Sequence, residues 1–356
     1  MKKAFALMLA LSMVLALLSA CSGGSNEQRV VNVCGWGENI DPDLIEQFEE
    51  ETGIKVNYQE ADSNETMYAK IKQGGTDYDV IVPSDYMIAR MIEEDMLAEL
   101  NYDNIPNFDL IDDQYKNLSY DPENKYTVPY TWGTLGVIYN SSKVDYPISS
   151  WGAMFDEMYA GQIGMIGNPR DALAIGLMRL GYSDEAQIRE AYQLIADAKA
   201  AGVYQGFFMD QLYDKMEAGE TTICAYYAGD FLSMYQNNND LRFEVPEDGS
   251  NWFVDAMCVL KDAEHKEEAE AWINFITSTE ASLKNMDYIW YASPNAEALE
   301  QYPAYYEELY GEELDPELYA IMAPSKEVLP TCGAYENLPD DTNALYSDLW
   351  IELGIE

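Results

Sequence analysis

The sequence is poor in basic residues. Its 356 residues include 20 Lys and Arg against 64 Asp and Glu, which gives a formal net charge of −44. A surface of this charge repels nucleic acid and anionic lipid headgroups, and it attracts cations. It is also compatible with a role in solubility alone, because charge by itself does not identify a ligand. The length is sufficient for two domains of ordinary size.

The residues and motifs of several common catalytic sites are also missing. The single histidine, His265, lies in a charged segment that predicts a solvated loop or a helix start, which argues against a Ser-His-Asp triad or a histidine-rich metal site. There is no P-loop, and Gly35-Trp36-Gly37 lacks the third glycine of a dinucleotide fingerprint. We therefore expect no catalytic residue, cofactor or metal. Paired carboxylates still allow a secreted glycoside hydrolase as an alternative.

Cysteine is scarce and forms no metal-binding pattern. Beyond Cys21, the chain has Cys34, Cys224, Cys258 and Cys332, with no C-x-x-C spacing. Each of the four fits a small buried hydrophobic residue, and in an exported protein they could also pair. The sequence leaves both alternatives open.

The N-terminus has the features of a secretory signal. Lys2 and Lys3 precede an apolar run over residues 4–18, and Leu18-Ser19-Ala20-Cys21 is typical of a bacterial lipobox. We expect a signal peptide over 1–20, then a lipidated Cys21 and a tether over 21–29. The apolar run over 4–18 is too short for a comfortable transmembrane span, and no apolar run elsewhere in the chain reaches about 18 residues. The predicted location is extracytoplasmic, anchored by lipid to the outer face of the cell membrane (the periplasmic side if an outer membrane is present).

Strands and helices alternate from residue 30 onward. Strands are predicted over 30–34, 54–58 and 78–82, separated by one helix that opens at Asp41-Pro42 and another that begins near Ser63. This order is typical of a parallel α/β sheet, in which ligands lie beyond the carboxyl ends of the strands. Trp36 and the segment 84–86 fall at those ends.

A second α/β set begins near residue 151. Strands are predicted over 163–166, 222–227 and 241–245. Helices are predicted before Gly181, over 188–200, over 267–276 and near 343–353.

The segment 251–260 organises the chain. It is apolar on both faces, which predicts a buried strand, and Asp255 is its only carboxylate. A buried carboxylate costs several kcal/mol unless a cation pairs with it. Because basic side chains are few, a cation from solution is favoured over an internal Lys or Arg.

Aromatic residues recur at the predicted strand ends, with carboxylates nearby. Rings and carboxylates together suit an alkylammonium ligand, because ring faces attract the cation and cover its methylene groups. Each ring could equally belong to the core. Asp171 also has a structural interpretation, since Asn168-Pro169-Arg170-Asp171 is typical of a helix start that an acid stabilises without any ligand.

Most of the chain beyond the N-terminal signal resembles the spermidine/putrescine-binding proteins of bacterial ABC importers. The matching segments are 46–56, 63–70, 79–84, 129–133, 180–183 and 293–295. The resemblance implies an α/β, two-lobed, periplasmic-binding-protein-like fold of type II, with parallel or mixed sheets linked by a hinge. Lobe 1 would comprise 30–131 and 256–292, and lobe 2 would comprise 132–255 and 293–356. The crossings would lie near Trp132-Gly133 and Val254-Asp255.

The resemblance also implies a ligand site. It places the acid that binds an amine on Asp255 and the acid facing the other part of the ligand on Asp171. The implied ligand-binding residues are Trp36, Asn39, Ser84, Tyr86, Asp171, Tyr226, Phe253, Asp255, Tyr291 and Glu336. The implied partners are a polyamine and the permease and ATPase subunits of an ABC importer, with the receptor a monomer.

Some positions depart from the family pattern. Asn39 stands where a Tyr is usual, Asn168 where an acid is frequent, and Tyr226 and Phe253 where Trp is usual; Glu336 falls on a position that is often Gln. The choice between putrescine and spermidine therefore stays open. Another organic cation, an amino acid or a sugar remains an alternative cargo, although an uncharged molecule would leave Asp255 and Asp171 unpaired.

Overall fold

The computed structural model describes residues 28–37, 39–182, 187–325, 328 and 332–355. The predicted signal peptide and Cys21 lie outside the described residues. In the described part of the chain, no helix has both the length and the apolar character needed to cross a membrane.

The first α/β unit follows the predicted order. Strand β1 (Val30–Trp36) runs parallel to β2 (Lys55–Ala61) and to β3 (Val80–Ile81). Helix α2 (Pro42–Thr52) begins at its predicted cap, because the Asp41 side chain accepts a bond from the backbone N–H of Asp43. It ends at Gly53, whose φ of 70° suits a residue without a Cβ. Helix α3 (Asn64–Gln73) is likewise capped by Ser63.

Two long antiparallel strands join this unit to the next. Strand β4 (Thr127–Asn140) pairs with β9 (Ser250–Val259), and Trp132 lies opposite Val254. Strand β9 also pairs with β3, while β4 continues into pairing with β7 (Ile223–Tyr227) and β8 (Leu241–Glu244). The predicted buried strand over 251–260 is confirmed as β9, whereas β4 extends well beyond the apolar run of the sequence over residues 135–139, which lies in its second half.

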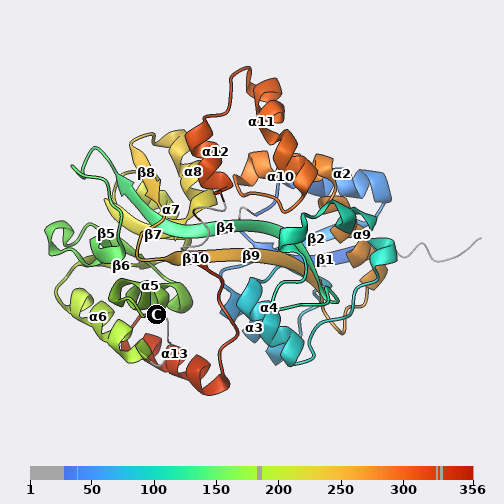
Figure 1. Ribbon diagram of the computed structural model, residues 1–356. Helices are drawn as coiled ribbons and strands as arrows, with labels where there is room; N and C mark the ends of the chain where they lie inside the picture. The colour runs from blue at the N-terminus through green and yellow to red at the C-terminus, as the bar shows by residue number, and fades with distance from the viewer. Residues whose placement is uncertain (1–27, 38, 183–186, 326–327, 329–331, 356) are drawn as a thin grey trace, which may run out of the picture.

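The second unit is also a mixed sheet with covering helices. Strand β5 (Ile163–Ile166) runs parallel to β6 (Tyr204–Phe208) and β7, which gives the overall order β2-β1-β3-β9-β4-β7-β5-β6. Helices α5 (Pro169–Leu180), α6 (Ile188–Ala200) and α13 (Asp340–Glu352) lie on one side of the sheet, and α8 (Ala228–Asn237), α10 (Thr279–Ile289), α11 (Ala296–Tyr310) and α12 (Pro316–Met322) lie on the other (Figure 1). The predicted α/β class is confirmed.

The apolar core is divided in the same way as the sheet. Phe48 and Trp272 are buried beside β1, where their rings meet edge to face at 5.1 Å between centroids, on α2 and α9 (Lys266–Ile276). A separate and larger cluster surrounds β4, β5 and β7, and it includes Trp151 and Tyr302. Each half of the sheet therefore has its own packed interior.

The remaining elements follow the same scheme. Helices α4 (Asp85–Glu93) and α7 (Asp210–Glu217) each begin shortly after a strand. The four cysteines among the described residues form no disulfide: Cys34, Cys224 and Cys258 are buried, and Cys332 is half-buried. The buried ones behave as small hydrophobic residues.

His265 occupies the predicted helix start but is not simply solvated. It immediately precedes α9, and its ring Nδ1 lies 3.1 Å from Oδ2 of the buried Asp79. Asp79 also accepts bonds from the backbone N–H of Asn32 at 2.9 Å, the Asn32 amide at 3.0 Å and the backbone N–H of His265 at 3.0 Å. This carboxylate thereby ties β1 to the start of α9.

We expect Asp79→Ala to lower the free energy of unfolding by about 3 kcal/mol, because it leaves buried N–H groups of Asn32 and His265 without an acceptor. Urea unfolding of the ligand-free protein measures the change. Asp77→Ala is the matched control, since Asp77 is exposed two residues away and should change stability by less than about 0.5 kcal/mol. Equal effects of the two substitutions would contradict this role of Asp79.

Candidate functional site

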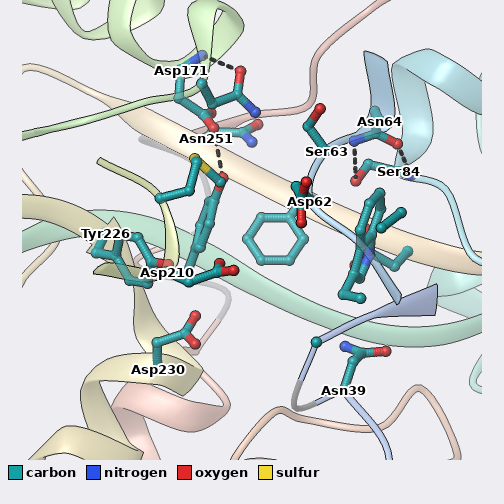
Figure 2. Close-up of a pocket in the computed structure, with 18 of the residues that line it drawn as sticks. Asn39, Asp62, Ser63, Asn64, Ser84, Asp171, Asp210, Tyr226, Asp230 and Asn251 are labelled. Carbon is teal, nitrogen blue, oxygen red and sulfur yellow. Dashed lines mark hydrogen bonds between the residues drawn. The ribbon is translucent and has the colours of Figure 1, made fainter. Parts of the chain in front are cut away.

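A cavity lies where the two halves of the sheet meet, with a volume of about 150 Å³. Its walls come from segments that follow β1, β2, β3, β6 and β7, from the start of α5 and from the middle of β9 (Figure 2). This is the position expected for a ligand in an open α/β sheet. The size suits a small molecule.

The structure brings nine of the ten predicted ligand-binding residues together around this cavity. They are Trp36, Asn39, Ser84, Tyr86, Asp171, Tyr226, Phe253, Asp255 and Tyr291. It does not place Glu336 there. The Glu336 side chain is exposed, and its backbone carbonyl accepts a bond from Arg170 Nη2 at 3.0 Å. The preceding residue, Tyr335, lines the cavity instead.

Asp255 is buried on β9 without a basic partner. Its Oδ2 accepts a bond from Trp36 Nε1 at 3.1 Å, and its Oδ1 has no hydrogen-bond partner. No Lys or Arg among the described residues forms an ion pair with it. Burial raises the pKa of Asp255 to about 6, and the neighbouring Ser84 hydroxyl and Trp36 indole only partly offset that rise. An external cation would remove this cost.

Asp171 combines both roles considered from the sequence. Its backbone N–H belongs to the capped start of α5, where Asn168 Oδ1 accepts it at 3.4 Å. Its carboxylate lines the cavity (Asp171 is labelled in Figure 2) and accepts the hydroxyls of Tyr227 at 2.7 Å and Tyr335 at 3.0 Å. Burial raises the pKa of Asp171 to about 6 despite these two donors.

A third carboxylate of the cavity, Asp230, is half-buried and was not predicted. It lies on the first turn of α8 and accepts the hydroxyl of Tyr291. Burial, together with the nearby negative charge of Asp210, raises the pKa of Asp230 to about 6, and the Tyr291 hydroxyl opposes the rise. Asp230 and Asp210 therefore form another negative region of the wall.

The sequence offered a signal for some of the residues it missed. Asp62, Asp85 and Asp230 stand shortly after strands that the sequence predicts, so the strand-end rule applied to carboxylates would have selected them. Asp210 follows β6, a strand that was not predicted, so the rule could not have selected it. Tyr335 gave no such signal. It reaches the cavity because β10 (Cys332–Gly333) pairs with the start of β9, a long-range contact.

The ionisable residues that line the cavity are predominantly acidic. Its acids are Asp62, Asp85, Asp171, Asp210, Asp230 and Asp255, and its rings are Trp36, Tyr86, Tyr226, Tyr227, Phe253, Tyr291 and Tyr335. Among the described residues that line it there is no Lys, Arg or His. Such a lining attracts a cation with an apolar body.

Arg170 is a basic residue that contacts rings of the cavity wall but does not itself line the cavity. Its guanidinium stands 5.5, 5.0 and 5.3 Å from the ring centroids of Tyr86, Tyr335 and Tyr346, respectively. These contacts fasten Tyr86, on α4, to the start of α5 on the opposite side of the cavity.

The fold and the cavity define a solute-binding protein of the two-part α/β type. The chain belongs to the family described as bacterial extracellular solute-binding proteins, whose sequence pattern matches residues 43–308.

Relatives and solved structures agree with this membership. The chain is 30% identical over 330 residues to the spermidine/putrescine-binding periplasmic protein of Salmonella typhimurium, covering 89% of each chain. It is 34% identical to the solved spermidine/putrescine ABC transporter substrate-binding protein of Streptococcus pneumoniae, with a TM-score of 0.75 and coverage of 92% of this chain and 98% of that one. A solved protein of Listeria monocytogenes is 35% identical, with a TM-score of 0.84 and coverage of 92% and 99%.

We expect Asp255→Asn to stabilise the ligand-free protein at pH 7.5 by about 1–3 kcal/mol. The native pKa of about 6 exceeds the unfolded value of about 3.9, so the folded state holds more protons between these values and stability falls as the pH rises through them. The full cost of the charge is present above pH 6. Asn removes that charge and keeps an acceptor for Trp36.

Urea unfolding at pH 7.5 and at pH 4 measures the effect, which should nearly disappear at the lower pH. Asp262→Asn, an exposed acid on the turn just after β9, is the control and should change little at either pH. A variant less stable than the parent protein at pH 7.5 would show that Asp255 is not an uncompensated charge.

Proposed function

We propose that the protein captures a polyamine, putrescine or spermidine, and delivers it to the permease and ATPase subunits of an ABC importer. The observation that carries the proposal is a cavity lined by six carboxylates and seven aromatic rings, with no basic residue among the described lining. The names of the relatives from Salmonella typhimurium and Streptococcus pneumoniae, which mention spermidine and putrescine, support the same cargo.

The proposed site holds the cargo at several carboxylates. Asp255 binds one ammonium group through its open Oδ1, and Asp171 or Asp230 binds another. Each charge-assisted hydrogen bond contributes roughly 1.5–3 kcal/mol. The rings of Trp36 and Phe253 cover the methylene chain, and each ring near a cation adds about 0.5–2 kcal/mol. Capture of the cargo involves no catalysis and requires no cofactor.

We propose that the remaining predicted residues also contact the cargo, except that Tyr335 replaces Glu336. Ser84 and Tyr86 line one side of the cavity, and Tyr226 and Tyr291 line the other. Asn39 lines the floor near Trp36. In place of Glu336 we propose Tyr335, because its hydroxyl is bound to Asp171 and its residue lines the cavity.

We also propose that the two halves are lobes that close on the cargo. Lobe 1 comprises 30–131 and 256–292, and lobe 2 comprises 132–255 and 293–356. The pairing of β4 with β9 around Trp132 and Val254 supports this division, because these strands enter both parts of the sheet. Cargo shifts the equilibrium towards the closed form, which the permease then recognises.

The membrane attachment belongs to the same proposal. A signal peptide over 1–20 is removed, Cys21 carries lipid, and a tether over 21–29 holds a monomeric receptor at the outer face of the cell membrane. An uncharged cargo such as a sugar is disfavoured, since it would enclose Asp255 and Asp171 without a counter-charge.

Calorimetric titration of the purified protein with putrescine and with spermidine tests the proposal. We expect binding of at least one of them, and Asp255→Asn should weaken it by more than about 1.5 kcal/mol because a charge-assisted bond is lost. Asp262→Asn should leave the affinity unchanged. An absence of heat with both cargoes would refute the function, whereas unchanged affinity in Asp255→Asn would refute only the role of that residue.

The affinity should fall at acidic pH. The empty protein holds Asp171, Asp230 and Asp255 with pKa values raised to about 6, and an ammonium group needs the ionised carboxylates, so the bound form holds fewer protons. At pH 5 only about a tenth of each carboxyl is ionised, and we expect binding at least tenfold weaker than at pH 7.5. Titrations at both pH values measure this. Equal affinities would contradict cation capture by these acids.

A further inference from the structure

Asp85 is a buried acid of the cavity that the proposed function has not yet used. It is the first residue of α4, directly after Ser84, and its residue is 3% exposed. Its Oδ1 accepts the backbone N–H of Tyr86 at 2.7 Å. Among the described residues, no Lys or Arg forms an ion pair with it, and no bond to its Oδ2 is formed.

The position of Asp85 at a helix start does not account for its burial. An acid in the first turn of a helix is stabilising when it stays in water, as Asp43 does on α2, where it is exposed. Asp85 is instead removed from water beside another acid. Ser84 and Asp255 form an isolated antiparallel bridge, which sets Asp85 next to the strand that carries Asp255.

Charged and titratable groups face Asp85 from several elements. Asp255 approaches from β9, Asp171 and Arg170 from α5, and Tyr120 from the segment before β4. Burial raises the pKa of Asp85 well above its ordinary value, the charges of Asp255 and Asp171 raise it further, and Arg170 opposes them. The single cation in this group is therefore insufficient to balance the acids.

An independent feature of the same cavity points to a ligand. Asp255 Oδ1 and Asn39 Oδ1 are buried polar atoms without any hydrogen-bond partner, and their residues are 6% and 7% exposed and line the cavity. Native proteins rarely leave such atoms unsatisfied. A donor that enters the cavity would satisfy them.

We infer that Asp85 is a second carboxylate for the cargo's amine at Asp255, so that one ammonium group is bound by two acids. This inference rests on the proposed function. An ammonium group has three N–H donors, and Asp255 Oδ1 and Asp85 Oδ2 offer acceptors for two of them. With an ammonium group bound, both acids can ionise, and their two negative charges then favour a primary ammonium over a neutral polar group.

The pairing has a consequence for protons. Two adjacent buried acids do not both ionise readily, so in the empty protein at least one of them keeps its proton near neutral pH. Entry of an ammonium group favours the ionised forms and expels that proton. Cargo binding at neutral pH is therefore coupled to proton release, and Asp85 contributes to the number released.

The test compares Asp85→Asn with the parent protein and with Asp43→Asn, a first-turn acid away from the cavity. We expect Asp85→Asn to weaken putrescine binding about tenfold or more at pH 7.5. We also expect fewer protons released per cargo bound, measured by titration in two buffers of different ionisation enthalpy. Asp43→Asn should change neither quantity.

A measurement without cargo separates this inference from failure of the proposed function. The empty Asp85→Asn protein should have a higher melting temperature than the parent at pH 7.5, because the Asp85 carboxyl must either be buried as a charge or take up a proton on folding, and Asn avoids both costs. A helix-stabilising acid predicts a lower melting temperature for the variant. Asp85→Ser, which also lacks the charge, serves as a second variant should Asn fail to fold.

Each outcome has a distinct meaning. Unchanged affinity and proton release in Asp85→Asn, with binding lost in Asp255→Asn, would overturn the role of Asp85 and leave the receptor function intact. A lower melting temperature in both Asp85 variants would also overturn it. If the parent protein binds neither putrescine nor spermidine, the proposed function and the inference that rests on it both fail, even if the variants are more stable.

Discussion

Negative charge held out of water without a fixed counter-charge is the constraint on which the rest of this structure depends. Asp171, Asp230 and Asp255 are each buried enough to raise the pKa to about 6, and the described lining of the cavity holds no basic side chain. A stable protein ordinarily pairs such groups or leaves them in water. Here hydroxyl and indole donors hold the carboxylates in place and leave their charge uncompensated.

The architecture explains how these acids come together. The carboxyl ends of β1 and β3 meet the middle of β9, so Trp36 and Ser84 approach Asp255 from the first half of the sheet. Strands β6 and β7 bring Asp210 and Tyr227 from the second half. Because β4 and β9 pair along much of their length and belong to both halves, they hold the two walls close enough for one small molecule to contact both.

Much of the fold could be predicted because local signals were strong. The cap at Asp41 and the stop at Gly53 follow from residue chemistry that operates within one turn. The helix over 188–200 follows from its helical spacing of apolar residues, of which Ile188, Ala191 and Ile195 are buried. The first half of strand β4 was not predicted because it contains Pro129 and polar threonines, and pairing with β9 rather than local preference keeps these residues extended.

The residues of the candidate site show the same difference between those that the sequence identifies and those that depend on long-range pairing. Asp255 and Asp171 could be selected from the sequence, one by its apolar surroundings and the other through a family resemblance. Tyr335 could not, because it reaches Asp171 only through the pairing of β10 with β9. The displacement from Glu336 to Tyr335 is a single residue, which a loose alignment cannot resolve but the direction of a side chain decides.

The free-energy cost of burying carboxylates in the empty site also explains how the proposed receptor discriminates a cationic cargo from a neutral one. A pKa raised from about 4 to about 6 corresponds to roughly 3 kcal/mol for one carboxylate at neutral pH, an amount comparable with a charge-assisted bond to an ammonium group. Enclosing several such acids without cargo is therefore unfavourable, while enclosing them around a cation removes the penalty. A ligand shifts a conformational equilibrium only by its differential affinity for the two states, and here that difference arises from the charges themselves. Closure without cargo, or around a neutral molecule, would retain the free-energy cost of the enclosed charges. The same acids that destabilise the empty protein therefore ensure that the closed form is populated mainly when a polyamine is bound.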